Sequence, residues 1–439
     1  MAGLTLESAL LAAIVVVLIV LLSVGFANRP ASAIPLLLLV EVGVASSITP
    51  AVMVGHLHVY AGDILVTALV VATLLRWHQH GARLQPLAPL SVFLVILLFN
   101  MLRGVAIFGL QPPIVAAREM LAMLTAAVFF STVRVTPQLV RAVRNWLLLA
   151  SGTLIVVAIN FWLQHGFGTY AATGARALDG LQALIVLETT VMVVVFPLFR
   201  GPILRWVVPL VGFVVVVLSI QRTVWVAGLV AVAVLVVVRQ KGRGTMSVAG
   251  RRLVVVAAVL AVLFLVAAGP SGVTSSLTTG YQQTSATQNS TFSWRLKSWS
   301  FLINRQIAGP AADLVVGSPS GTGNVRTIDG NTTAAPAHSE YVESLTMTGI
   351  IGLTLLLWAY VIALRKHRLR LRSPSAFVGQ AALMFIALLA LQLTYLITYS
   401  EGTLVGLMLG LACGYVQESD QEPSIDRSQR LMAATTQGS

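Results

Sequence analysis

Charged side chains are scarce in this chain of 439 residues, of which only 10% are charged while 57% are hydrophobic. The mean hydropathy of +0.88 lies far above that of water-soluble proteins, which excludes a soluble domain and predicts a protein that crosses a membrane many times. Acidic residues are the rarest charged group, so the formal net charge is +13. Because the basic residues fall in short loops between apolar runs, this charge indicates membrane topology and not nucleic-acid binding.

Cysteine is also nearly absent, since Cys413 is the single one in the chain. One cysteine excludes an intrachain disulfide and a cysteine-based metal site. Cys413 lies inside the last apolar run, where we expect a small buried side chain.

At the other end, the apolar run 10–26 follows Glu7 and is too long for a signal-peptide core, so we expect it to be retained as the first span.

Apolar runs that are candidates for membrane spans recur along most of the chain. Together they predict an all-α integral membrane protein with about 12 to 13 transmembrane helices and one large extracytoplasmic loop containing short helices. The runs lie near residues 8–27, 32–48, 51–75, 87–110, 113–133, 143–163, 181–199, 204–220, 223–238, 252–269, 347–364, 376–399 and 402–417.

Basic clusters within 239–252 and 365–372 orient these spans, because short loops rich in Lys and Arg stay in the cytoplasm. The polar interval between the clusters must then lie outside the cell, as must the amino terminus. The chain is accordingly divided into an amino-terminal transmembrane bundle (1–269), an extracytoplasmic loop that carries the active-site residues (270–346), carboxy-terminal transmembrane helices (347–417) and a disordered cytoplasmic tail (418–439).

Arg295 is the first candidate for chemistry in the extracytoplasmic loop. On a helix it shares one face with Ser298, Trp299 and Leu302, at spacings of three, four and seven residues. Tryptophans on both sides indicate a segment at the membrane interface, with the cation facing water or an anion. The alternative is that Arg295 is a solvated anchor.

His338 is the second candidate, near the end of the same loop. It follows Pro336, a residue that favours the first turn of a helix. The unpaired N–H groups of a first turn disfavour imidazolium, so we expect a neutral imidazole that can accept a proton. The alternative is an ordinary surface histidine.

Arg222 lies in an apolar run, 206–238, whose only polar side chains cluster at 219–223. A single helix of that length would measure roughly 50 Å against a hydrocarbon core of about 30 Å, so we predict two short helices with a turn at Arg222. The turn would leave this cation in a recess below the outer face, where an anionic partner or a functional site is expected. The alternative is a side chain that extends to the lipid headgroups.

Arg118, near the outer end of its span, is placed to add to an anion site, whereas Glu119 and Asp63 are better explained by internal ion pairs.

The order of these features resembles the O-antigen ligase and O-antigen polymerase superfamily of bacterial envelope glycosyltransferases. The resemblance covers roughly residues 185–415: an Arg in a tight intramembrane turn (SIQRT), an outer segment that begins with Arg295 and Trp299, a Gly-rich patch, and His338 in HSEYVESLTMTGIIGL leading into a span. The chain departs from the family at Ser339, where Asn is usual, and at Thr348, where an acidic residue is often found. These departures bear on the acceptor more than on the reaction.

The resemblance implies transfer of a glycan from a polyprenyl (undecaprenyl-type) diphosphate donor to a hydroxyl of a glycan or lipid-glycan acceptor, at the extracytoplasmic face of the bacterial plasma membrane. It implies no metal and no cofactor. The bilayer and other envelope-assembly proteins would be further partners. The implied catalytic residues are His338, Arg295 and Arg222, and the implied substrate-binding residues are Arg118, Glu340 and Tyr341.

Physical chemistry agrees with this set, because arginines bind phosphate as a fork and a neutral imidazole can take the acceptor proton. The residues alone leave two other classes open. A multispanning transporter or flippase for an envelope glycan precursor would also place charged residues within the membrane. A non-catalytic scaffold is the third possibility. The sequence does not distinguish a ligase from a polymerase.

Overall fold

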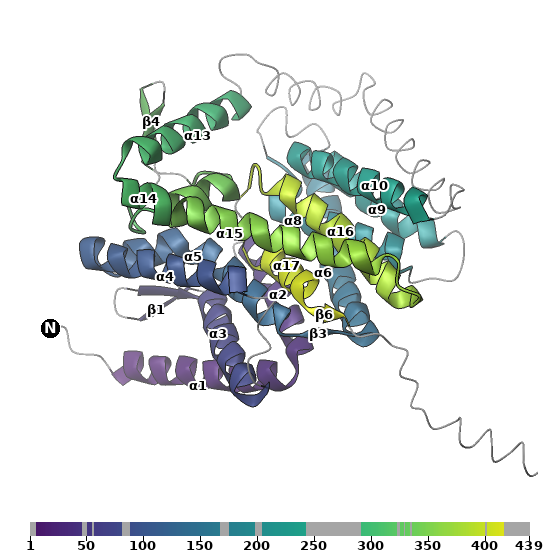
Figure 1. The fold of residues 1–439 in the computed structure, drawn as a ribbon, viewed down its shortest axis with the longest axis horizontal. Helices are drawn as coiled ribbons and strands as arrows, with labels where there is room; N and C mark the ends of the chain where they lie inside the picture. Colours follow the sequence, from purple (N-terminus) through teal and green to yellow (C-terminus); the bar gives the residue numbers. More distant parts are fainter. Residues whose placement is uncertain are drawn as a thin grey trace, which may run out of the picture.

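The computed structural model describes residues 6–45, 51–54, 57–80, 88–166, 175–197, 204–242, 291–322, 325–328, 330–333, 336–399 and 402–416. It is mostly helical (Figure 1). The helices are α1 (Leu6–Asn28), the 3-10 turn η1 (Pro30–Ser32), α2 (Ala33–Ala45), α3 (Ala61–His80), α4 (Ala88–Phe108), α5 (Gln111–Ser131), α6 (Pro137–His165), α8 (Gly180–Val195), α9 (Leu204–Leu218), α10 (Arg222–Gly242), α13 (Thr291–Ala308), α14 (Ala311–Val316), α15 (Glu340–Arg370), α16 (Ala376–Tyr395) and α17 (Thr403–Cys413).

Short two-stranded sheets accompany the helices. An antiparallel hairpin joins β1 (Ala51–Val54) to β2 (Leu57–Tyr60), and a second joins β4 (Arg326–Ile328) to β5 (Asn331–Thr333). A parallel pair joins β3 (Arg134–Val135) to β6 (Tyr415–Val416), which ties the end of α5 to the end of α17. The first hairpin corrects the sequence analysis, which expected one span over 51–75, whereas the helix α3 begins at Ala61.

The described residues contain seven helices long and apolar enough to cross a membrane and five shorter apolar helices. This confirms an all-α membrane architecture, while the number of 12 to 13 spans and the large extracytoplasmic loop stay predictions. The expected span near 252–269, the start of the outer loop and the tail lie outside the described residues. The turn expected at Arg222 is confirmed, because α9 ends at Leu218 and α10 begins at Arg222.

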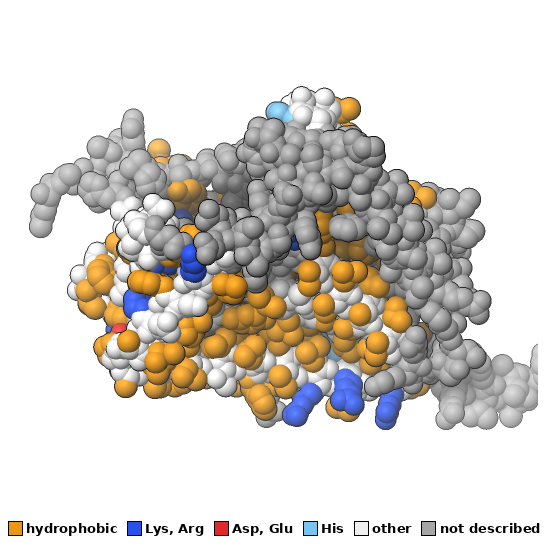
Figure 2. Space-filling model, turned by 90° about the horizontal axis from the view of Figure 1, so that it is seen from above, with side chains coloured by type: hydrophobic (Ala, Val, Ile, Leu, Met, Phe, Trp, Pro, Cys, Tyr) orange, Lys and Arg blue, Asp and Glu red, His pale blue; other side chains and the backbone are white. Residues whose placement is uncertain are grey.

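The core lies around α16 and α17, whereas the outer helices expose apolar side chains. The segment Leu404 to Cys413 of α17 is buried throughout, and it packs against α5. By contrast, Leu21, Leu102 and Leu163 are 65%, 70% and 81% exposed. Figure 2 shows a broad hydrophobic surface on one face, with Lys and Arg side chains mainly toward its margins. Such a surface is matched by lipid tails and not by water.

The two ends of the bundle carry different structures. At one end, Arg76 donates hydrogen bonds to Thr132 and to the Ala27 carbonyl, and Lys366 donates to the carbonyl of Cys413, beside β3 and β6. At the other end lie α13, α14 and the β4–β5 hairpin (Figure 1). A basic end opposite a polar cap is what the predicted orientation requires, with the basic end in the cytoplasm.

Two glycines allow α14, which belongs to the polar cap formed by α13, α14 and the β4–β5 hairpin, to pack directly against α15. Gly317 and Gly349 have φ of 97° and 67°, a region that residues with a Cβ rarely adopt. A Cβ on Gly317 would lie 2.3 Å from the Met347 carbonyl oxygen, and one on Gly349 would lie 2.3 Å from the Val315 carbonyl oxygen. Backbones of α14 and α15 therefore pack in direct contact, and α15 kinks at Gly349.

Candidate active site

The segment Leu396–Tyr399, between α16 and α17, contacts Arg295, both neighbours of Arg222 and Glu340, two residues after His338. Arg295 donates a hydrogen bond of 3.2 Å from Nη1 to the Thr398 carbonyl, and its guanidinium lies 5.4 Å from the centre of the Tyr399 ring. Both contacts are to neutral groups. The expected helical face is confirmed as well, since Ser298 and Leu302 are fully buried.

The Arg222 turn reaches the same segment through its two neighbours. Tyr399 donates from its hydroxyl to Oε1 of Gln221 over 2.9 Å, and Thr398 donates to the hydroxyl of Thr223 over 2.7 Å. Ile220 begins the turn with a φ of 57°, a rare conformation for a β-branched residue. Arg222 is thus held between two residues that are fixed to the segment carrying Arg295.

Arg176 adds a cation that the sequence analysis missed. Its Nη1 donates to Oε1 of Gln221 over 3.0 Å, which places it beside the Arg222 turn. Arg176 lies in the connection before α8, and nothing in its local sequence distinguishes it from a loop arginine. The tertiary contact with Gln221 is the signal that identifies it.

His338 does not lie in the first turn of a helix, and the sequence analysis was wrong on this point. The helix α15 begins at Glu340, with Ser339 as its N-cap, and His338 precedes the cap with a φ of 52°. Two anchors fix this conformation: Trp299 donates from Nε1 to the Ala337 carbonyl over 2.8 Å, and Arg326 donates to the Pro336 carbonyl over 3.1 Å.

The neutral imidazole expected for His338 is nevertheless supported by its surroundings, for a different reason. Burial lowers the pKa of the half-buried His338 imidazole below its ordinary value, and the positive charges of Arg295 and Arg326 lower that pKa further. The neutral ring, able to accept a proton, is therefore the form present near neutral pH.

Arg326, at the start of β4, is a second cation that the sequence analysis did not find. Its side chain is only 1% exposed, and its guanidinium lies 5.1 Å from the centre of the Trp294 ring. Burial lowers its pKa, the charge of Arg305 lowers it further, and Glu343 acts in the opposite direction. The buried guanidinium of Arg326 thus interacts electrostatically with His338, Arg305 and Glu343.

Glu340 and Tyr341, predicted to bind substrate, connect the start of α15 to the 396–399 segment. The backbone N–H of Glu340 donates to the carbonyls of Leu396 and Tyr399 over 3.0 and 3.2 Å, and the Tyr341 hydroxyl donates to the Leu393 carbonyl over 2.7 Å. These contacts fix the start of α15, two residues after His338, to the end of α16 and the segment that also binds Arg295. Contact with a sugar stays a prediction for both residues.

Arg118 takes part in a separate contact. It forms an ion pair of 2.9 Å with Asp63, and its guanidinium lies 4.5 Å from the centre of the Tyr60 ring. The internal pair expected for Asp63 is thus present. Because Arg118 faces α3 and β2, its predicted part in an anion site has no support from these contacts.

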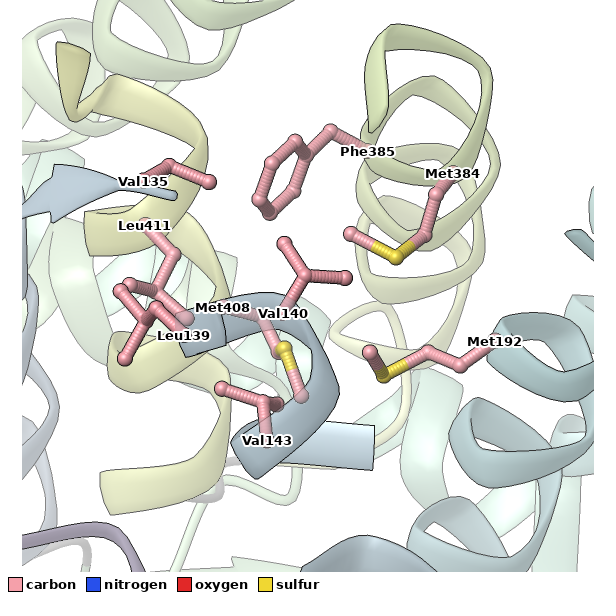
Figure 3. Close-up of a pocket in the computed structure, with 9 residues that line it drawn as sticks. All are labelled: Val135, Leu139, Val140, Val143, Met192, Met384, Phe385, Met408 and Leu411. Carbon is pink, nitrogen blue, oxygen red and sulfur yellow. The ribbon is translucent and has the colours of Figure 1, made fainter. Parts of the chain in front are cut away.

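Two hollows in the described structure differ in character. One has a volume of about 490 Å³ and is lined by both polar and apolar residues from the start of α5, the loop after α14 and the first turns of α15, with Arg305 of α13. The other, between α6, α8, α16 and α17, measures about 10 Å³ and is lined only by apolar side chains (Figure 3). The small apolar gap has no group that could do chemistry.

Within the described ranges, no three histidine, cysteine or carboxylate side chains come close enough together to hold a metal ion. The cationic groups around the 396–399 segment are instead guanidiniums, which suit an anionic ligand. Metal independence stays a prediction that requires its own measurement.

Comparison with known proteins adds no assignment: no protein-family model matches the chain, and no curated protein matches it.

Proposed function

We propose that this chain is a membrane glycosyltransferase that moves a glycan from a polyprenyl-diphosphate donor to a hydroxyl of an acceptor glycan, at the extracytoplasmic face of a bacterial plasma membrane. One observation carries the proposal. Arg295 bonds to the segment Leu396–Tyr399, both sequence neighbours of Arg222 bond to it, and so does Glu340, two residues after His338, although these residues come from three separate parts of the sequence. This is the arrangement expected of the O-antigen ligase and polymerase superfamily that the sequence resembles.

The arginines supply what the departing diphosphate needs. As the bond between the anomeric carbon and the diphosphate oxygen breaks, negative charge grows on the leaving group, and fixed cations stabilise that charge. Arg295 touches a carbonyl and a ring, both neutral, so its charge remains available to a ligand. A guanidinium binds phosphate oxygens through two parallel N–H bonds, and it does so more strongly where water is excluded.

His338 supplies the base. The acceptor oxygen forms its bond to the anomeric carbon as its proton passes to the imidazole, and the leaving diphosphate carries away the bonding electron pair. Burial, together with the charges of Arg295 and Arg326, keeps the pKa of His338 low, which keeps the ring neutral before the reaction. The bilayer surrounding the apolar helices would admit the polyprenyl chain from the side.

A deletion strain tests the proposal against a transporter or flippase. We expect a strain that lacks the chain to accumulate lipid-linked donor in the outer leaflet of the plasma membrane, because flipping continues while transfer stops. Complementation with the wild-type chain should clear the donor, and complementation with His338→Ala should not. Accumulation in the inner leaflet would instead identify a flippase, and clearance by His338→Ala would remove the catalytic assignment.

A further inference from the structure

The cavity of about 490 Å³ has the size of a small-molecule site, which typically measures about 300–1,000 Å³. It is bounded by α5, the loop 318–322, α13 and α15, so it shares α13 and α15 with the His338 region. Pro336 lines it, two residues before His338. A molecule in the cavity would therefore lie against the segment that carries the proposed base.

The polar groups that line the cavity suit hydroxyl groups. Glu119 and Glu343 offer carboxylates, which accept hydrogen bonds from hydroxyl donors at about twice the strength of neutral acceptors. Arg305 offers donors. Ser320 lines the same space, is only 2% exposed, and its hydroxyl has no hydrogen-bond partner among the described residues. A buried hydroxyl without a partner is costly unless a ligand or water bonds to it.

The cavity lining carries charges of both signs. Arg305 lies in the same lining as the carboxylates Glu119 and Glu343, and the buried Arg326 interacts electrostatically with Arg305 and Glu343. Such a lining favours neither an anion nor a cation, whereas an uncharged ligand rich in hydroxyls finds both donors and acceptors in it. Apolar surface from Val115 and Met347 completes the lining and suits the C–H face of a sugar ring.

We propose that this cavity is a binding subsite for an uncharged pyranose, the acceptor sugar whose hydroxyl His338 deprotonates. The acceptor role rests on the proposed function, because the sugar nearest the base must be the one that loses a proton. The leaving diphosphate then occupies the other side of His338, toward Arg295 and Arg222.

Protection of an introduced cysteine tests the subsite without measuring transfer. Thr322 lines the cavity and is exposed, and the native Cys413 is buried, so Thr322→Cys gives one reactive thiol in the full chain purified in detergent. Methyl α-glucopyranoside and N-acetylglucosamine are the neutral probes, with glucuronate and glucosamine as charged ones. A neutral probe at ten times its Kd should slow maleimide labelling about tenfold, since labelling follows the free fraction.

Three controls make the outcome decisive. Labelling of Asn331→Cys, exposed on β5 and outside the cavity lining, should not change with any sugar. Glu119→Gln, an exposed position with little risk to folding, should raise the probe concentration needed for protection by about tenfold. Glu343→Gln should act in the same direction.

Equal slowing at Thr322→Cys and Asn331→Cys, no slowing by either neutral probe, or stronger protection by glucuronate would each overturn the proposal. Transfer is measured separately on the same preparation. Transfer without protection would remove only the subsite. Protection without transfer would keep a sugar site in the cavity and reject the glycosyltransferase.

Discussion

At Arg222 and Arg295, the effect of the positive charge can be separated from the effect of the forked guanidinium shape. Lysine keeps the positive charge of arginine but cannot form two parallel bonds to a phosphate group. We therefore expect Arg222→Lys and Arg295→Lys to insert and fold normally yet to lose most of the transfer rate. The measurement is transfer by purified variants, with thermal stability as the control for folding. Near wild-type rates in both would make these side chains membrane anchors.

The acid side of the pH profile reports on His338. Below its pKa the imidazole is protonated and cannot accept a proton, so transfer should fall as the pH drops through that pKa. Burial, Arg295 and Arg326 lower the pKa from the ordinary 6.5, so activity should persist below that pH. Arg326→Gln removes one positive charge, raises the pKa of His338, and should move the acid limb to higher pH.

Arg326→Lys is the matched control, because it keeps the charge and should leave the acid limb near its wild-type position. A limb that does not move in Arg326→Gln, in a variant that still folds and transfers, would mean that Arg326 does not influence the base.

At the scale of elements, the contact between α14 and α15 positions the site. Gly317 lies at this contact, where a larger residue would not fit. An alanine there would have both a positive φ and a Cβ against the Met347 carbonyl. We expect Gly317→Ala to destabilise the protein by roughly 1–3 kcal/mol or more. Gly152 in α6 has open space around its Cβ position, so Gly152→Ala should change stability by no more than about 1 kcal/mol. Thermal unfolding in detergent compares the two, and equal stabilities would contradict the described packing.

Elements were predictable where periodicity or length constrained them. The buried face of α13 follows from the spacing of Arg295, Ser298 and Leu302, and the break at Arg222 follows from the length of the apolar run against the bilayer. The start of α15 was misplaced, because Pro336 is a weak signal and the tertiary anchors Trp299 and Arg326 decide the backbone there. The first hairpin was missed because apolar strands and apolar helices have similar composition.

The roles of Arg176 and Arg326 could not have been predicted from the sequence. Both are cations in polar segments, and only the folded chain brings them to Gln221 and to Pro336. Conversely, Arg118 stood out in the sequence as an intramembrane cation, yet it lies against Asp63. Composition therefore identifies which residues are unusual, whereas contacts decide which of them act together.

At the scale of the whole molecule, the two ends should lie on opposite sides of the membrane. Asn331 on β5 and Arg372 after α15 are both exposed and belong to opposite ends of the bundle. In intact spheroplasts an impermeant maleimide should label Asn331→Cys, and it should label Arg372→Cys only after permeabilisation. Labelling of Arg372→Cys from outside would reverse the orientation and place His338 in the cytoplasm.

The central claim is that His338 and the arginines transfer a glycan without a metal ion, and reconstituted transfer tests it most directly. The purified chain should join a glycan from a polyprenyl-diphosphate donor to an acceptor glycan at an unchanged rate in EDTA, because arginines and not a divalent cation would bind the diphosphate. In the same assay His338→Ala should lose about 10² to 10⁴ in rate, the usual contribution of a general base. Loss of transfer in EDTA with recovery on added magnesium or manganese, or transfer by His338→Ala at more than about a tenth of the wild-type rate, would contradict the account.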